Sequence, residues 1–296
     1  MRWSIRAWCT GKGMATTHIP AEPSWWRIFS RNRGSVLGAF ILAALFALAI
    51  LAPMLPFEAG RIDVGPSMAA PNLTHLMGTD ELGRDVFSRA AAGLSVSLMV
   101  GLGAATISTF LGVVIGGLAG FFGRSIDALL MRLTEIFQVI PRFFLAVLLV
   151  AFFGANIFNI LIAIAVLSWP EIARLVRGEF LSLRSRQFVD AARVAGASRT
   201  SLIFGEILPN ALGPVVVNAT LMVGQAMLLE AGLSYLGLGD PTKASLGQML
   251  QEAQQIMRSA WWTTAFPGSF IFLAVLSLNL VGDGLTDVLN PRARGR

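Results

Sequence analysis

Apolar residues lie along this chain in blocks of about twenty, separated by polar segments rich in proline, glycine and charge. As an α-helix rising 1.5 Å per residue, a block of that length crosses a hydrocarbon layer roughly 30 Å thick. Six blocks meet this requirement, at residues 35–55, 94–122, 127–153, 157–173, 210–232 and 264–285. The pattern therefore predicts an all-α membrane protein with about six transmembrane helices.

Composition supports the same class. Hydrophobic residues make up 55% of the 296 residues and charged residues 14%, against roughly 25% charged in soluble domains. The single cysteine, Cys9, excludes an intramolecular disulfide. His18 and His75 lie far apart with no cysteine cluster near them, so we expect no metal site. The net charge of +6 is spread over the loops, and we expect no nucleic-acid partner.

The chain divides into four predicted parts. These are a tail with an interfacial segment (1–34), a first transmembrane helix with an external segment (35–92), a five-helix core containing the polar loop 174–206 (93–289), and a short tail (290–296). Trp25 and Trp26 are expected to anchor the tail at the headgroup level. Met14 is an alternative start to Met1, and the sequence leaves that choice open.

Arginine and lysine predict the orientation. With the N-terminus inside, the inner segments hold 17 of these residues and the outer segments five, while Arg142 lies within a span. Because cytoplasmic loops carry the excess of positive charge, both termini are predicted in the cytoplasm. Residues 57–92 and 233–262 are then external.

The polar stretch between the fourth and fifth spans is longer than a connection requires. It contains a short amphipathic segment with small residues at Ala191, Ala192 and Gly196, and Pro209 marks the return to the membrane. Small side chains allow another protein to approach closely. From the residues alone, two interpretations stay open: a helix that docks a partner protein, or one that lies on the lipid surface.

A family resemblance bears on this choice. Asp190-Ala191-Ala192, Gly196 and Ile207-Leu208-Pro209 resemble the "EAA" loop of permeases of binding-protein-dependent ABC importers, with Asp190 where the family usually has glutamate. Residues 78–85, 233–239, 259–262, 266–268 and 279–291 resemble segments of the dipeptide/oligopeptide/nickel permeases, and specifically the C-type member of the permease heterodimer. Leu246 departs from that pattern, since many of these permeases carry tryptophan there.

The resemblance implies a type I ABC importer permease fold in a bacterial or archaeal cytoplasmic membrane. It also implies four kinds of partner: a second permease subunit, two cytoplasmic ATPase subunits, an external solute-binding protein and the lipid bilayer. ATP and magnesium would bind the ATPase subunits, with no cofactor and no catalytic residue on this chain. The cargo would be di- or oligopeptides, with nickel, glutathione or opines as alternatives. The residues expected to couple to the ATPase are Asp190, Ala191, Ala192, Gly196, Ile207, Leu208 and Pro209.

Arg142 and Glu230 lie within predicted spans, where a charge at the bilayer centre costs roughly 3 kcal/mol. Arg142 could attract a peptide carboxylate in the pathway, or serve a structural role, for instance by pairing with Glu135; we expect the structural role. Glu230 could line an outer gate or form a structural hydrogen bond to a neighbouring helix.

Charged residues outside the spans also have two interpretations. Asp80, Arg84 and Asp85 could contact the binding protein or form a self-contained salt-bridged turn. Asp283 and Asp287, one turn apart, are expected to pair with arginines of the C-terminal tail.

Two other classes of protein compete with the importer subunit. A membrane-embedded enzyme would need convergent catalytic groups, but no histidine, cysteine or lysine lies in any predicted span. A phosphate-binding loop requires a lysine after its glycines, and neither Lys12 nor Lys243 has that frame. An ion-coupled transporter acting alone would need intramembrane acids for its ion but no long cytoplasmic loop. Association with a separate ATPase distinguishes the three classes.

Overall fold

The computed structural model describes residues 25–54 and 60–289, without the side chains of Trp25 and Trp26. The expected interfacial anchor therefore lies outside the described side chains, and Cys9, His18 and the two candidate start residues lie outside the described residues. Within the described part, the regular secondary structure is helical apart from one isolated bridge between Thr79 and Asp85.

Most helices follow one another with short connections, and the longest connection lies between η1 and α3. In chain order they are α1 (Trp25–Arg31), α2 (Arg33–Leu51), η1 (Ala52–Met54), α3 (Val86–Phe122), α4 (Arg124–Val139), α5 (Arg142–Phe153), α6 (Ile157–Leu183), α7 (Gln187–Val194), α8 (Arg199–Ser201), η2 (Leu202–Ile207), α9 (Leu208–Leu233), η3 (Ser234–Leu238), α10 (Leu246–Ala253) and α11 (Trp262–Leu289). In this part of the chain, five helical stretches are long and apolar enough to cross a membrane, and the bent pair α4–α5 makes a sixth. The all-α class and the count of about six spans are confirmed.

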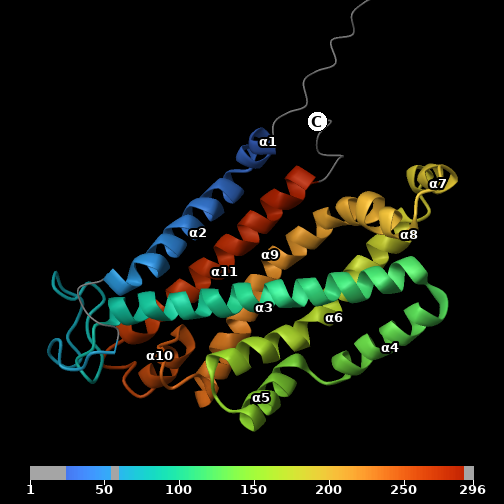
Figure 1. Cartoon of the computed structure of the whole chain (residues 1–296). Coiled ribbons are helices and arrows are strands. Elements are labelled where there is room, and N and C mark those ends of the chain that lie inside the picture. Colours follow the sequence, from blue (N-terminus) through green and yellow to red (C-terminus); the bar gives the residue numbers. More distant parts are fainter. Residues whose placement is uncertain (1–24, 55–59, 290–296) are drawn as a thin grey trace, which may run out of the picture.

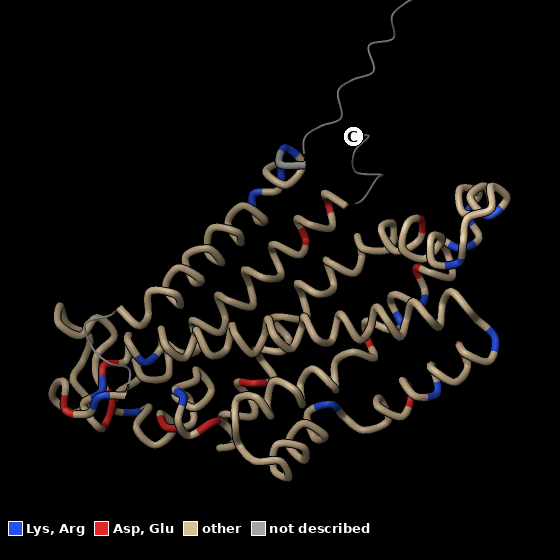
Figure 2. The backbone as a smooth tube through the Cα atoms, viewed as in Figure 1, with Lys and Arg blue, Asp and Glu red and all other residues tan. Residues whose placement is uncertain are grey.

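The long helices run side by side between two polar ends (Figure 1). At one end lie α1, α7 and the last turn of α11; at the other lie residues 60–85 and α10. Charged residues gather toward these ends and leave the middle of the bundle largely uncharged (Figure 2). This distribution is the one expected of a bundle whose middle lies in lipid.

The third span differs from the prediction of one continuous helix over 127–153. The structure breaks it into α4 and α5, which meet at an angle of 82°. Ile140 adopts extended dihedral angles (φ −93°, ψ 134°) before Pro141. A proline disfavours the helical conformation of the residue before it, so the Ile140–Pro141 pair ends α4. The sequence analysis placed this proline inside a helix and missed the break.

Two other helices are longer than predicted. Helix α3 begins at Val86 instead of 94, because the Asp85 side chain accepts a hydrogen bond from the Ser88 N–H (2.8 Å) and caps the helix. Helix α6 continues to Leu183 instead of ending at 173. Its last turns are held by Arg177, which donates two hydrogen bonds to the carboxylate of Asp127 on α4. The connecting segment is correspondingly shorter than the predicted loop 174–206.

Helices α3 and α6 form a close contact through glycine. A Cβ added to Gly112 would lie 2.5 Å from Ile172 Cβ, and one added to Gly120 would lie 2.5 Å from Phe180 Cβ. An added Cβ at Gly116, midway between them, would collide with the carbonyl oxygen of Ala173. Small residues at a spacing of four let two backbones approach closely in lipid. The glycines of α3 therefore bring α6 into close contact with it.

Candidate functional site

The segment between α6 and α9 forms a compact projection at one end of the bundle. We call residues 184–209 the coupling loop; it contains α7, α8 and η2 (Figure 1). Arg184, at its start, donates hydrogen bonds to the carbonyl oxygens of Gly120 (3.0 Å) and Phe121 (3.2 Å) at the end of α3. These carbonyls have no partner within their own helix, so Arg184 fixes the loop's starting point to the bundle.

Helix α7 ends in a Schellman motif. The Ala197 N–H donates to the Ala192 carbonyl oxygen (3.0 Å), and the Gly196 N–H donates to that of Arg193 (3.1 Å). Gly196 has φ +87°, in the left-handed region that favours glycine. A Cβ added there would meet no atom of this chain within 4 Å. Gly196 is therefore required for the backbone turn, and the space around it is open.

Apolar side chains hold the coupling loop against the bundle. Val189, Leu202 and Ile207 are buried in the same core cluster as residues of α3, α6 and α9. The segment from Leu202 to Ile207 is a π-helical turn, a geometry that occurs often at functional sites. Pro209 follows it near the start of α9, where its missing N–H leaves no helical hydrogen bond unmade.

The opposite face of α7 points away from the bundle. Asp190 and Ala191 are exposed, and Val194 is 90% exposed. Asp190 accepts a hydrogen bond from Arg193 Nη1 at 2.8 Å. Phe204, on η2, is also an exposed large apolar side chain. The exposed side of the loop thus presents apolar side chains as well as the Asp190–Arg193 pair.

The structure divides the seven predicted coupling residues into two groups. Asp190, Ala191, Gly196 and Pro209 are exposed, while Ala192 and Leu208 are half-buried and Ile207 is buried. A partner could contact the first group directly. Ile207 contributes instead by anchoring the loop to the core.

Arg142 is placed at the break in the third span, as the first residue of α5. Its Nη2 lies 2.9 Å from Glu171 Oε2 on α6, and its Nη1 lies 3.4 Å from Ser168 Oγ. The expected pairing with Glu135 is wrong, because the bend at Pro141 turns α5 away from α4. Glu135 lies 3.5 Å from Arg132 on its own helix. The sequence analysis missed Glu171, which is 29 residues from Arg142 and has no local signal.

Glu230 is enclosed where α3, α9 and η3 meet. Only 2% of the residue is exposed. Its Oε2 accepts a hydrogen bond from Ser97 Oγ (2.7 Å), and its Oε1 accepts one from Ser234 Oγ (2.8 Å). The geometry favours the structural hydrogen bond over the gate position.

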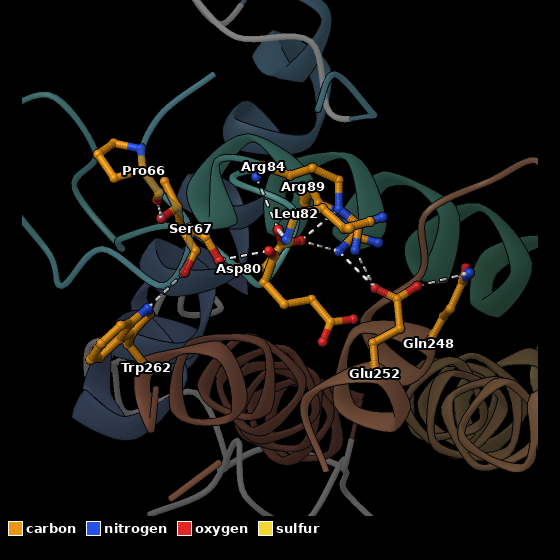
Figure 3. A network of polar contacts seen from close by, with 11 residues as sticks. Pro66, Ser67, Asp80, Leu82, Arg84, Arg89, Gln248, Glu252 and Trp262 are labelled. Atoms are coloured by element: carbon orange, nitrogen blue, oxygen red, sulfur yellow. Dashed lines mark hydrogen bonds and ion pairs between the residues drawn. The ribbon is translucent and has the colours of Figure 1, made fainter. Parts of the chain in front are cut away.

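At the opposite end, four charged side chains form a buried network (Figure 3). Asp80 Oδ2 accepts from Arg84 Nε (2.6 Å) and Arg89 Nη1 (2.9 Å). Glu252, from α10, accepts from Arg84 Nη2 (2.8 Å) and Arg89 Nη1 (2.9 Å). The network joins residues 60–85, α3 and α10 into one unit (residues 60–89 and 240–262). We call it the outer cap, after the external side that the sequence predicts for it.

Two further contacts complete the outer cap. His75 Nδ1 lies 2.9 Å from Asp85 Oδ2, and Trp262 Nε1 donates to the Thr79 carbonyl oxygen at 3.1 Å. Asp80, Arg84 and Asp85 thus have their partners inside the cap, as in the salt-bridged turn considered above. The ion pairs also include Glu252 of α10. Leu246 is buried too, so the departure from tryptophan alters packing within the cap.

Asp240, at the edge of the outer cap, anchors the connection between α5 and α6. The Thr242 hydroxyl donates to Asp240 Oδ1 (2.7 Å) and lowers the pKa of this carboxyl group below its usual value. The other oxygen accepts from the Ile157 N–H (3.1 Å) at the start of α6. A carboxylate at a helix N-terminus is stabilised by the helix dipole.

Two further groups of residues remain. Asp287 accepts a hydrogen bond from Asn32 Nδ2 (3.2 Å), while the arginines expected to pair with Asp283 and Asp287 lie outside the described residues. Among the described residues, no group of three or more histidine, cysteine, aspartate or glutamate side chains could hold a metal ion.

Five long apolar helices, a broken sixth and a projecting helical turn make up the architecture of a multi-spanning membrane permease. The chain belongs to the family of binding-protein-dependent transport system inner membrane components, which matches residues 112–295. Residues 24–71 match the N-terminal transmembrane domain of oligopeptide transport permease C. The family is one of transport subunits.

Relatives extend the match over most of the chain. The dipeptide transport system permease protein DppC of Alkalihalophilus pseudofirmus is 40% identical over 267 residues, which cover 89% of this chain and 88% of the relative. The oligopeptide transport system permease protein OppC of Haemophilus influenzae is 40% identical over 272 residues, covering 90% and 88%.

A solved structure has the same fold. A chain of the MetNI methionine ABC transporter in inward-facing conformations matches with a TM-score of 0.51 and 22% identity, covering 66% of this chain and 94% of that one. The expected type I ABC importer permease fold is confirmed.

Proposed function

We propose that this chain is one of two permease subunits of an ATP-driven importer for di- or oligopeptides. It provides half of the membrane pathway and no catalytic group. Two cytoplasmic ATPase subunits bind ATP and magnesium, and one of them takes the coupling loop into a groove on its surface. An external solute-binding protein delivers the peptide.

The observation that carries the proposal is the exposed face of α7. Its Schellman turn and its buried anchors fix the loop in one conformation, while Ala191 and Val194 remain uncovered by this chain. An interfacial lipid-bound helix would have its apolar face toward the bilayer. Here the apolar anchors face the bundle, which favours docking to a protein.

The proposed orientation places the coupling loop and both termini in the cytoplasm. The distribution of arginine and lysine supports this orientation, as does the position of α1, α7 and the end of α11 at one end of the bundle (Figure 1). Reporter fusions at residues 70 and 245 should both read as external. A cytoplasmic signal at either position would contradict the assignment of spans.

The peptide cargo rests on the names of the relatives, which transport dipeptides or oligopeptides. The test is ATP-dependent uptake of labelled di- and oligopeptides by proteoliposomes that contain this chain, a second permease and the ATPase subunits, with the binding protein added outside. Uptake that needs all components supports the proposal. Uptake by this chain alone, driven by an ion gradient, would overturn it.

A further inference from the structure

We infer that Arg142 and Glu171 form a binding site for the two charged termini of a passing peptide. This inference rests on the proposed function, since it requires that a zwitterionic peptide crosses the bundle. Arg142 would bind the peptide carboxylate and Glu171 its terminal ammonium group. The inference replaces the purely structural role expected for Arg142 from the sequence.

The position of the pair is the first argument. Glu171 lies in α6, one of the helices long and apolar enough to cross a membrane. It is about 21 Å along the helix from Ile157, at 1.5 Å per residue. The side chains of Arg142 and Glu171 are nevertheless 34% and 39% exposed. Charged side chains inside spans face the interior of a bundle or a water-filled cavity. We therefore expect the exposed side of the pair to face a water-filled pathway instead of lipid.

The unused hydrogen-bonding capacity is the second argument. A guanidinium group has five N–H donors, and the described residues supply acceptors to Arg142 only at Nη1 and Nη2. Glu171 Oε2 accepts from Arg142, while its Oε1 has no partner among the described residues. Both side chains can therefore bind a ligand group, and Arg142 can bind a carboxylate in the forked geometry that arginine favours.

Charge balance selects the ligand. If the two side chains separate around a zwitterion, the carboxylate of the ligand replaces Glu171 as the partner of Arg142. Its ammonium group replaces Arg142 as the partner of Glu171. A ligand with only one charge would leave either Arg142 or Glu171 unpaired in a region of low dielectric constant, which is strongly unfavourable. The pair therefore matches a small peptide with both termini free.

The break in the third span gives the site a way to open. Arg142 follows Pro141 directly, so the ion pair connects the start of α5 to α6 across the 82° bend. Pro170, within α6, precedes Glu171 and removes one backbone hydrogen bond from that helix. Both partners thus lie beside a proline, where a helix is most easily displaced.

The decisive variant removes both charges at once, Arg142→Gln with Glu171→Gln. Losing both partners leaves no unpaired buried charge, so the loss of the ion pair should not by itself prevent folding. The matched control is Arg132→Gln with Glu135→Gln, a pair on α4 whose side chains are 82% and 64% exposed. Each variant is reconstituted as the full complex with its binding protein, and two quantities are measured: peptide imported per ATP hydrolysed, and photo-adducts of a dipeptide carrying a diazirine-bearing leucine.

We expect the double variant to assemble and to hydrolyse ATP in response to the loaded binding protein. Imported peptide per ATP should fall by about tenfold or more, the loss implied by removing charge-assisted hydrogen bonds to both termini. Wild-type adducts should map near Arg142 and Glu171 and should disappear in the double variant, with the control unchanged. Arg142→Lys, which keeps the charge, should retain more import than Arg142→Gln.

Three results would overturn the site. These are an unchanged import ratio in the double variant, adducts that persist without the charges, or failure of the double variant to assemble, which would assign the pair to packing. If the wild-type complex itself shows no ATP-dependent uptake, the proposed function fails instead, so the two failures are distinguishable.

Discussion

The two ends of the bundle are held together by different forces. The outer cap depends on charge: two arginines and two carboxylates, buried or half-buried, meet at distances of 2.6 to 2.9 Å. The coupling loop depends on apolar anchors such as Val189 and Ile207 and on a backbone turn at Gly196. Its one described ion pair, Asp190 with Arg193, is more than half exposed on both sides.

This difference shows where each end is sensitive. Both ends expose some apolar side chains, Leu73 at the outer end and Val194 at the inner end, so exposure alone does not distinguish them. In the outer cap, removing one charge leaves the remaining charges with fewer partners. In the coupling loop, the charges are solvated and dispensable for folding, whereas the shape of the exposed face is what a partner would contact. The following predictions test this contrast.

The largest effect is expected from Asp80→Asn in the outer cap. The substitution leaves Arg84 and Arg89 to share Glu252 alone, and breaking a buried ion pair from one side costs about 3–5 kcal/mol. The purified protein should therefore unfold at a clearly lower temperature in a fluorescence melting assay. Glu81→Gln, at an exposed neighbouring position, is the control and should melt like the wild type. Equal melting of both variants would show that the network does not hold the cap.

An intermediate effect is expected from Gly196→Ala in the coupling loop. Alanine at φ +87° is strained by about 1–2 kcal/mol, although the space there is open. Hydrogen exchange should accelerate in residues 187–198 while the melting temperature of the bundle stays unchanged. Gly196→Asn should exchange more slowly than Gly196→Ala, because asparagine tolerates the left-handed region better. Protection equal to wild type in the alanine variant would contradict the Schellman turn.

The smallest effect is expected from Asp190→Asn. The pair with Arg193 is exposed, and pairs of this kind contribute roughly 0–1 kcal/mol. Melting should therefore be indistinguishable from that of the wild type. A loss of stability as large as that of Asp80→Asn would remove the distinction between the two ends.

The sequence predicts the elements of this fold better than the contacts between them. Apolar block length locates the spans, and the glycines of α3 identify a close helix contact. Pro141 is visible in the sequence, but the size of the bend depends on how α5 packs against α6. Partnerships such as Arg84–Glu252, separated by 168 residues, have no local signal.

The candidate site shows the same limit. The resemblance identifies the coupling loop, including the residues that the structure exposes. It does not separate Ile207, which anchors the loop, from Ala191, which faces outward, because both belong to one motif. That distinction depends on which face of each short helix meets the bundle. Glu171 escaped notice because its role follows from the break at Pro141 and not from its own neighbours in the sequence.

The central claim is that the exposed face of α7 binds an ATPase subunit. The most direct measurement is the amount of ATPase that co-purifies with the Ala191→Arg variant. Ala191 is exposed, so arginine leaves this chain's packing intact, unlike a substitution at the half-buried Ala192. The matched control is Ser125→Arg, at an exposed position in the first turn of α4. A loss of 1.4 kcal/mol in binding free energy corresponds to an affinity about tenfold lower, and a buried unpaired charge costs more.

We predict that Ala191→Arg inserts and pairs with the second permease normally but loses about tenfold or more of its ATPase. Ser125→Arg should retain its ATPase. Full ATPase association in Ala191→Arg would contradict the docking role of the coupling loop.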